Sequence, residues 1–135
     1  MNLDPLLDDL SALLNLPRLR LDEQHACALR LEGRVRVQLH FTPSADALRL
    51  VAVVGRASSD GRLALLSSLL KGNLRQALDG QPVFGFDRQT ETVVLTHALD
   101  GSQQCAHAIA WQIHHLADLC RGARRALLAD GALQA

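Results

Sequence analysis

Eight residues in the first third of the chain alternate strictly between polar and apolar side chains. In Arg34–Phe41, read as RVRVQLHF, valine, leucine or phenylalanine fills every second position, and arginine, glutamine or histidine fills the others. Successive side chains of a strand point to opposite faces, so this period of two predicts a β-strand with one face on a core and one face in water. Such a strand belongs in an antiparallel sheet, and the chain must therefore supply further strands and a cover for the apolar face.

Four more strands are expected around this one. Cys27–Leu31 alternates in the same way, and the short step at Glu32 and Gly33 predicts a tight hairpin with Gly33 at positive φ. Ala47–Gly55 is more densely apolar, so we expect both its faces to be covered and the strand to lie centrally or next to a helix or partner. The two remaining strands are expected at Val83–Phe86 and Thr92–Ala98.

Three amphipathic helices are expected to cover the sheet. The first occupies the opening stretch, where leucines recur at helical spacing, and it ends before Pro17. The second runs from Arg62 to about Leu78, and its apolar arc is wide enough to predict burial on more than one side. The third runs from about Gln103 into the 120s, and we expect a frayed tail from about residue 129.

The element order α-β-β-β-α-β-β-α predicts an α+β fold, with an antiparallel twisted sheet of about five strands and three helices. The length of 135 residues suits a single domain over residues 1–135. Lys and Arg number 14 and balance 14 Asp and Glu, and aromatic residues make up 3%. A binder of many phosphates carries a basic excess, and a single-strand binder needs aromatic platforms, so we expect no nucleic-acid partner.

The sequence also argues against a membrane-inserted or exported protein. No apolar run approaches the roughly 18–20 residues that span a bilayer. The opening residues lack the basic and apolar regions of a signal peptide, and the three cysteines are odd in number and widely spaced. We therefore expect a cytoplasmic protein with reduced thiols and no membrane insertion.

Local catalytic patterns are missing from the sequence. It contains no phosphate-binding glycine loop, no dinucleotide fingerprint, no H-E-x-x-H and no G-x-S-x-G. His107 and His114 share a predicted helix, but they are seven positions apart rather than the four that a zinc site on one helix prefers. We therefore expect no catalytic residue, no metal and no cofactor, with a small hydrolase or metal enzyme that uses these two histidines as an alternative.

Several strings, taken in order, carry a resemblance to a known family. They are LLDDLSALLNLP in the opening helix, LRLD at Leu19–Asp22, Cys-x-Leu-x-Leu from Cys27, LLKGNL at Leu69–Leu74, FGFD at Phe84–Asp87, VVL at Val93–Leu95 and the last helix with Trp111. Over residues 3–128 the chain resembles the class I type III secretion chaperones, the CesT-like (Tir chaperone) family. Members of that family are commonly acidic, whereas this chain is neutral.

The resemblance implies a homodimer without enzymatic activity in the bacterial cytoplasm. The dimer would bind the N-terminal region of a type III secreted effector in extended form and keep it stable and export-competent. An alternative is a dimeric regulatory module that sequesters a transcription regulator of the secretion system.

The second helix and the strand after it would form the dimer contact, for which the candidates are Leu66, Leu70, Leu74, Phe84 and Phe86. The effector would lie in grooves beside the first helix and along a sheet edge. The candidate effector-binding residues are Leu6, Leu10, Leu13, Val35, Val37 and Leu39. The sequence leaves open which leucines of the first helix face the core and which face the client.

Overall fold

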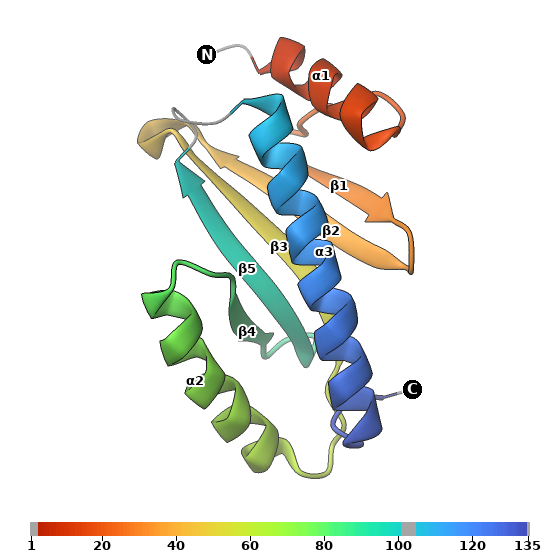
Figure 1. Ribbon diagram of the computed structural model, residues 1–135, viewed down its shortest axis with the longest axis vertical. Coiled ribbons are helices and arrows are strands. Elements are labelled where there is room, and N and C mark those ends of the chain that lie inside the picture. Colours follow the sequence, from red (N-terminus) through yellow and green to blue (C-terminus); the bar gives the residue numbers. More distant parts are fainter. Residues whose placement is uncertain (1–2, 101–104, 135) are drawn as a thin grey trace.

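The computed structural model describes residues 3–100 and 105–134, and these form a five-stranded sheet with helices over and beside it (Figure 1). In chain order the elements are α1 (Asp4–Leu14), β1 (Ala26–Leu31), β2 (Val35–Thr42), the 3-10 helix η1 (Pro43–Ala45), β3 (Ala47–Arg56), α2 (Arg62–Leu78), β4 (Val83–Asp87), β5 (Thr92–Asp100) and α3 (Ala106–Ala129). This order confirms the predicted α+β fold. Gln103, the predicted start of the last helix, lies outside the described residues.

The sheet is antiparallel throughout, with the strand order β1-β2-β3-β5-β4. The strand predicted from strict alternation is β2, where Val35 and Val37 are buried and Arg36 and Gln38 are exposed. In the turn between β1 and β2, Gly33 has a φ of 77° and Arg34 a φ of 59°. The hairpin and the positive φ of Gly33 are therefore confirmed.

The third strand lies centrally in the sheet, as predicted, and within the single chain only one of its two faces is covered. On one face of β3, Leu50 and Ala52 are completely buried; on the other, Val51 and Val53 are only half-buried and Arg49 is exposed. The physical reason is the placement of the helices. The helix α3 crosses one face of the sheet and α1 packs against α3, whereas α2 contacts the edge strand β4 and leaves the second face open (Figure 1).

The core lies between α3 and the inner face of the sheet. On α3, Ile109, Ile113 and Leu116 are 1% exposed or less, and Cys120 is fully buried with its Sγ directed at the Val53 carbonyl oxygen at 3.2 Å. Gly122 does not interrupt the helix, which continues to Ala129. A single long helix thus supplies the cover that the alternating strands require.

The tail beyond α3 is packed, and its predicted fraying is wrong. Leu133 is 5% exposed and forms an isolated antiparallel bridge with Ala57, while the Gln134 amide donates to the Arg56 carbonyl at 2.8 Å. A side chain at Gly55 would place its Cβ 3.0 Å from the Leu133 Cδ1, so the glycine leaves the space that Leu133 fills. Burial of this one leucine, together with backbone hydrogen bonds, holds the tail against β3.

We expect Leu133→Ala to lower the free energy of unfolding by about 2–4 kcal/mol, because it empties a filled core position. Urea titration followed by circular dichroism measures the loss. Leu128→Ala is the control, since Leu128 is 41% exposed, lies outside α2, and its truncation should cost less. Equal stability of Leu133→Ala and the wild type would mean that the tail does not pack in solution.

Candidate functional site

The leucines of α1 divide into a buried set and a surface set. Leu7, Leu10 and Leu14 are buried in the core, whereas Leu6 is half-buried and Leu13 is 40% exposed. Of the three α1 candidates for client binding, Leu10 is therefore a core residue, and only Leu6 and Leu13 reach the surface.

The segment that follows α1 is tied back onto the helix. The hydroxyl of buried Ser11 donates to the Leu7 carbonyl at 2.7 Å and accepts from the Leu19 amide at 3.0 Å. The Arg20 guanidinium lies 2.8 Å from an oxygen of Asp8 and 3.7 Å from one of Asp4. The hydrogen bond from Arg20 is the main cause that lowers the pKa of Asp8 below its usual value. Two acidic residues of α1 thus orient the chain between α1 and β1.

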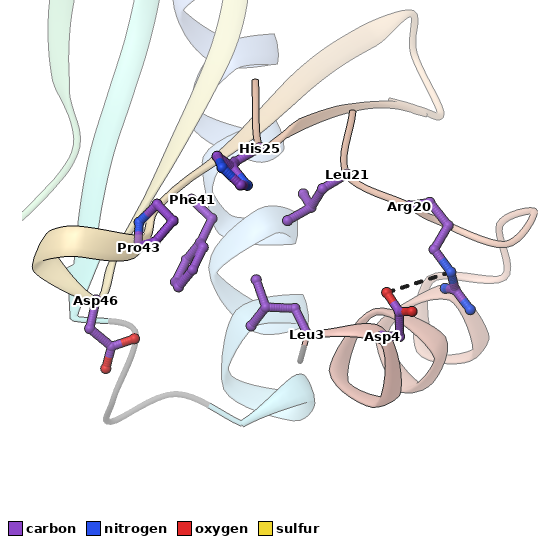
Figure 2. A pocket seen from close by; sticks show the side chains of 8 residues that line it. All are labelled: Leu3, Asp4, Arg20, Leu21, His25, Phe41, Pro43 and Asp46. Atoms are coloured by element: carbon purple, nitrogen blue, oxygen red, sulfur yellow. Dashed lines mark ion pairs between the residues drawn. The ribbon is translucent and has the colours of Figure 1, made fainter. Parts of the chain in front are cut away.

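A pocket of about 550 Å³, here called the α1–β2 pocket, opens between the start of α1 and the end of β2 (Figure 2). In Figure 2, Leu3, Leu21 and Phe41 point toward one space, with the Arg20–Asp4 ion pair to one side and Asp46 to the other. The complete lining is Leu3, Asp4, Arg20, Leu21, His25, Phe41, Pro43 and Asp46. An apolar floor with charged groups around it can bind an apolar side chain of a ligand. The charged groups can then favour polar residues on either side of that side chain.

The three β2 candidates for client binding lie inside the domain. Val35 and Val37 are fully buried and Leu39 is 2% exposed, all on the face that α3 covers. Phe41, two residues beyond Leu39, is the apolar residue of this strand that lines the α1–β2 pocket. Alternation predicts which face of a strand is buried. Where the covering helices end, residues on that same face become accessible to a ligand, and the alternation does not show that position.

The helix α2 presents a continuous row of exposed leucines, here called the α2 stripe. Two predicted dimer residues, Leu70 and Leu74, are 69% and 68% exposed, and Leu66 is half-buried. Leu63 and Leu78 lie on the same side of the helix and are 82% and 79% exposed. The sequence-based dimer candidates omitted these two, although their spacing of seven and four from Leu70 and Leu74 extends the row by helical periodicity.

Specific contacts hold α2 against β4 so that the stripe faces outward. The Asn73 side-chain amide donates to the Phe84 carbonyl at 2.8 Å and accepts from the Phe84 amide. The Arg62 guanidinium lies 5.2 Å from the centre of the Phe86 ring and donates to the Ser58 carbonyl. Phe84 and Phe86, the two predicted dimer residues of β4, are half-buried and pack against the core.

Nucleophile and metal chemistry have little support in the described part of the chain. Burial, with a smaller contribution from Asp22, raises the pKa of the Cys27 thiol to about 11, and burial also raises the pKa of Cys120. His107 and His114 are exposed, and within residues 3–100 and 105–134 no three His, Cys, Asp or Glu side chains group closely enough to hold a metal ion. None of the described helices combines the length and apolar character needed to cross a membrane.

Several solved structures share the fold of this chain. A chain of the ExsC–ExsE complex is 24% identical with a TM-score of 0.80, over 91% of each chain. A chain of the HopA1–SchA chaperone–effector complex is 21% identical with a TM-score of 0.76, over 90% of this chain and 91% of that one. A chain from the crystal structure of the Yersinia pestis type III secretion chaperone SycH, in complex with a stable fragment of YscM2, is 18% identical with a TM-score of 0.70. The match covers 90% of this chain and 98% of that one. No curated protein sequence shows significant similarity.

The fold defines a class, the small α+β proteins that share the fold seen in these three complexes. The model of the Tir chaperone protein (CesT) family matches residues 5–124, which is most of the chain. The protein belongs to this family of chaperones, and the resemblance seen in the sequence is confirmed.

We expect Asn73→Ala to loosen α2 from the sheet, because the Phe84 amide and carbonyl would lose both partners, at a cost of about 1–3 kcal/mol. Hydrogen exchange should show faster exchange in α2 and β4 and unchanged exchange in β2. Lys71→Ala, an exposed change on the same helix, serves as the control. Unchanged protection of α2 in Asn73→Ala would contradict an anchoring role for this side chain.

Proposed function

We propose that the protein is a cytoplasmic chaperone of bacteria that binds, as a homodimer, the N-terminal chaperone-binding region of a type III secreted effector and keeps it stable and export-competent. The observation that carries the proposal is the pair of separate apolar surfaces that the described chain leaves uncovered: the α1–β2 pocket and the α2 stripe. Family membership supports a chaperone function without catalysis or cofactor. The description of the HopA1–SchA pair as a chaperone–effector complex supports a secreted client.

The α2 stripe is the proposed dimer contact. Leu63, Leu70, Leu74 and Leu78 run along a helix of 17 residues, about 25 Å long. A row of leucines of this length is larger than the isolated apolar residues that a monomer ordinarily exposes, and it lies opposite the face that packs on β4. A second copy of the same stripe is a suitable cover, because a two-fold contact pairs identical surfaces. In this contact, half-buried Leu66, Phe84 and Phe86 support the stripe from its side.

The α1–β2 pocket and the surface leucines of α1 are the proposed client site. An extended client segment would place an apolar side chain into the pocket and run past Leu6 and Leu13. The strand β1 lies at the edge of the sheet, so the segment could also add backbone hydrogen bonds there. In this proposal, Leu10, Val35, Val37 and Leu39 shape the groove from the core without touching the client.

The dimer proposal predicts that Leu70→Asp combined with Leu74→Asp gives a folded monomer. Each change would bury an unpaired carboxylate at the contact, at a cost of about 3–5 kcal/mol. Both residues are exposed in the single chain, so the fold should survive. Sedimentation velocity measures the mass of the particle in solution, and circular dichroism checks that the variant is folded.

The matched control for the dimer test is Ser68→Asp, an exposed position on the same helix that points about a third of a turn away from the stripe. It should remain dimeric. An intact dimer in the doubly substituted chain would overturn the assignment of the α2 stripe.

The client proposal predicts that Leu13→Glu weakens client capture at least about tenfold, since a charge would replace an apolar contact. The client is the protein that co-purifies with the tagged chain in its native host and disappears from the culture medium when the secretion apparatus is disabled. Leu128→Glu is the matched control, because Leu128 is 41% exposed and Leu13 is 40% exposed.

Normal capture by Leu13→Glu would remove α1 from the client site. Normal levels and export of every effector in a strain without this chain would contradict the chaperone function itself. Capture of a transcription regulator alone would favour the sequestering module.

A further inference from the structure

The hairpin between β1 and β2 gathers three exposed arginines around one hollow. Arg30, Arg34 and Arg36, here called the arginine tip, line a surface depression of about 520 Å³ together with Leu31 and Val35. Across residues 3–100 and 105–134, none of the ion pairs includes an arginine of the tip. By contrast, Arg18 and Arg20, in the segment after α1, both form ion pairs with Asp8.

Two arginines of the tip face each other across the strands. Arg30 on β1 is the direct partner of Arg36 on β2 in the antiparallel register, and both lie on the face of the sheet opposite α3. Like charges at directly opposite positions destabilise a sheet, so this pair opposes the stability of the isolated chain. A bound anion would relieve the repulsion.

The backbone of the tip is held in place from behind by α3. The Arg121 guanidinium donates to the Glu32 carbonyl at 2.7 and 3.1 Å, and Arg124 donates to the Gly33 carbonyl at 3.2 Å. A Cβ at Gly33 would lie 2.8 Å from the Arg121 Nε, so glycine permits this close approach. The tip arginines therefore extend from a backbone fixed before any partner binds.

The edge of β1 next to the tip is suited to an extended polypeptide. The Ala26 carbonyl accepts from the Asp22 amide on the side away from β2. Backbone groups two and four residues further along an antiparallel strand point the same way, so those of Ala28 and Arg30 face the free edge. A strand added there would place every second side chain on the open face of the sheet, beside Arg30.

We propose that the arginine tip binds an acidic polypeptide segment whose carboxylates recur at alternate positions along the β1 edge. Guanidinium groups match carboxylates in bidentate geometry, and no aromatic side chain lines the hollow to stack a nucleic-acid base. The identification of this segment as part of the effector client rests on the proposed function. The tip would then select clients whose apolar anchor for the α1–β2 pocket is accompanied by an acidic stretch.

Short fluorescent peptides that alternate threonine with glutamate, glutamine or lysine test the proposal by anisotropy at low salt. The wild type should bind the glutamate peptide about tenfold tighter than the glutamine peptide, and the lysine peptide more weakly still. Arg30→Glu with Arg36→Glu should reverse the order and prefer lysine. Arg75→Glu with Arg88→Glu makes the same change in net charge at exposed sites outside the tip and should keep the wild-type order.

Three results would overturn the proposal: no preference among the peptides in the wild type, an equal loss of preference in both double variants, or equally tip-dependent binding of an oligothymidine. Circular dichroism checks that each variant is folded. These peptides carry no apolar anchor, so their selectivity does not depend on the α1–β2 pocket. Failure of client capture with peptide selectivity intact would contradict the proposed function alone. Normal client capture without peptide selectivity would contradict the role of the arginine tip alone.

Discussion

The packing of α3 across one face of the sheet is the contact on which the rest of the structure depends. Ile113 and Leu116 close the core above the inner face, and α1 packs against α3. The same helix fixes the β1–β2 turn through Arg121 and Arg124. With this face occupied by α3 and α1, α2 lies beside the edge strand β4, and one side of it remains uncovered. The exposed stripe of α2 therefore follows from how the sheet is covered, and it is not a fault in the packing of the domain.

The uncovered surfaces lie on different elements, which permits different partners at the same time. The α1–β2 pocket is at the start of α1, whereas α2 lies along the opposite edge of the sheet (Figure 1). A contact through the stripe on α2 leaves α1 and the edge of β1 accessible. Changes at Leu70 and Leu13 should accordingly act on different associations, and a chain with this division can dimerise without closing its client site.

Periodicity in the sequence could predict the elements but not the neighbours of each element. Alternation located β2, and helical spacing located α2 with the bounds that the structure shows. Leu10 and Leu13 belong to one apolar pattern, yet Leu10 is buried and Leu13 is exposed. The difference depends on where α3 packs against α1, which the pattern does not contain. Leu133 is the single large apolar residue in a short tail, so no pattern could reveal that it fills the space above Gly55. The α1–β2 pocket unites residues from four segments, and for that reason it has no local signature.

The neutral total charge conceals an uneven distribution that a partner would sense. Charges act over about 8–10 Å at physiological ionic strength, so a partner responds to the groups near it and not to the sum. Thirteen of the fourteen cationic side chains are arginine. Near α1 the arginines are compensated, since Arg20 pairs with Asp4 and Asp8, whereas no carboxylate of the described residues forms an ion pair with Arg30 or Arg36. A chain with zero net charge thus keeps, among the described residues, arginines without an ion-pair partner at the β1–β2 hairpin, and this local charge is more informative about the partner than the isoelectric point.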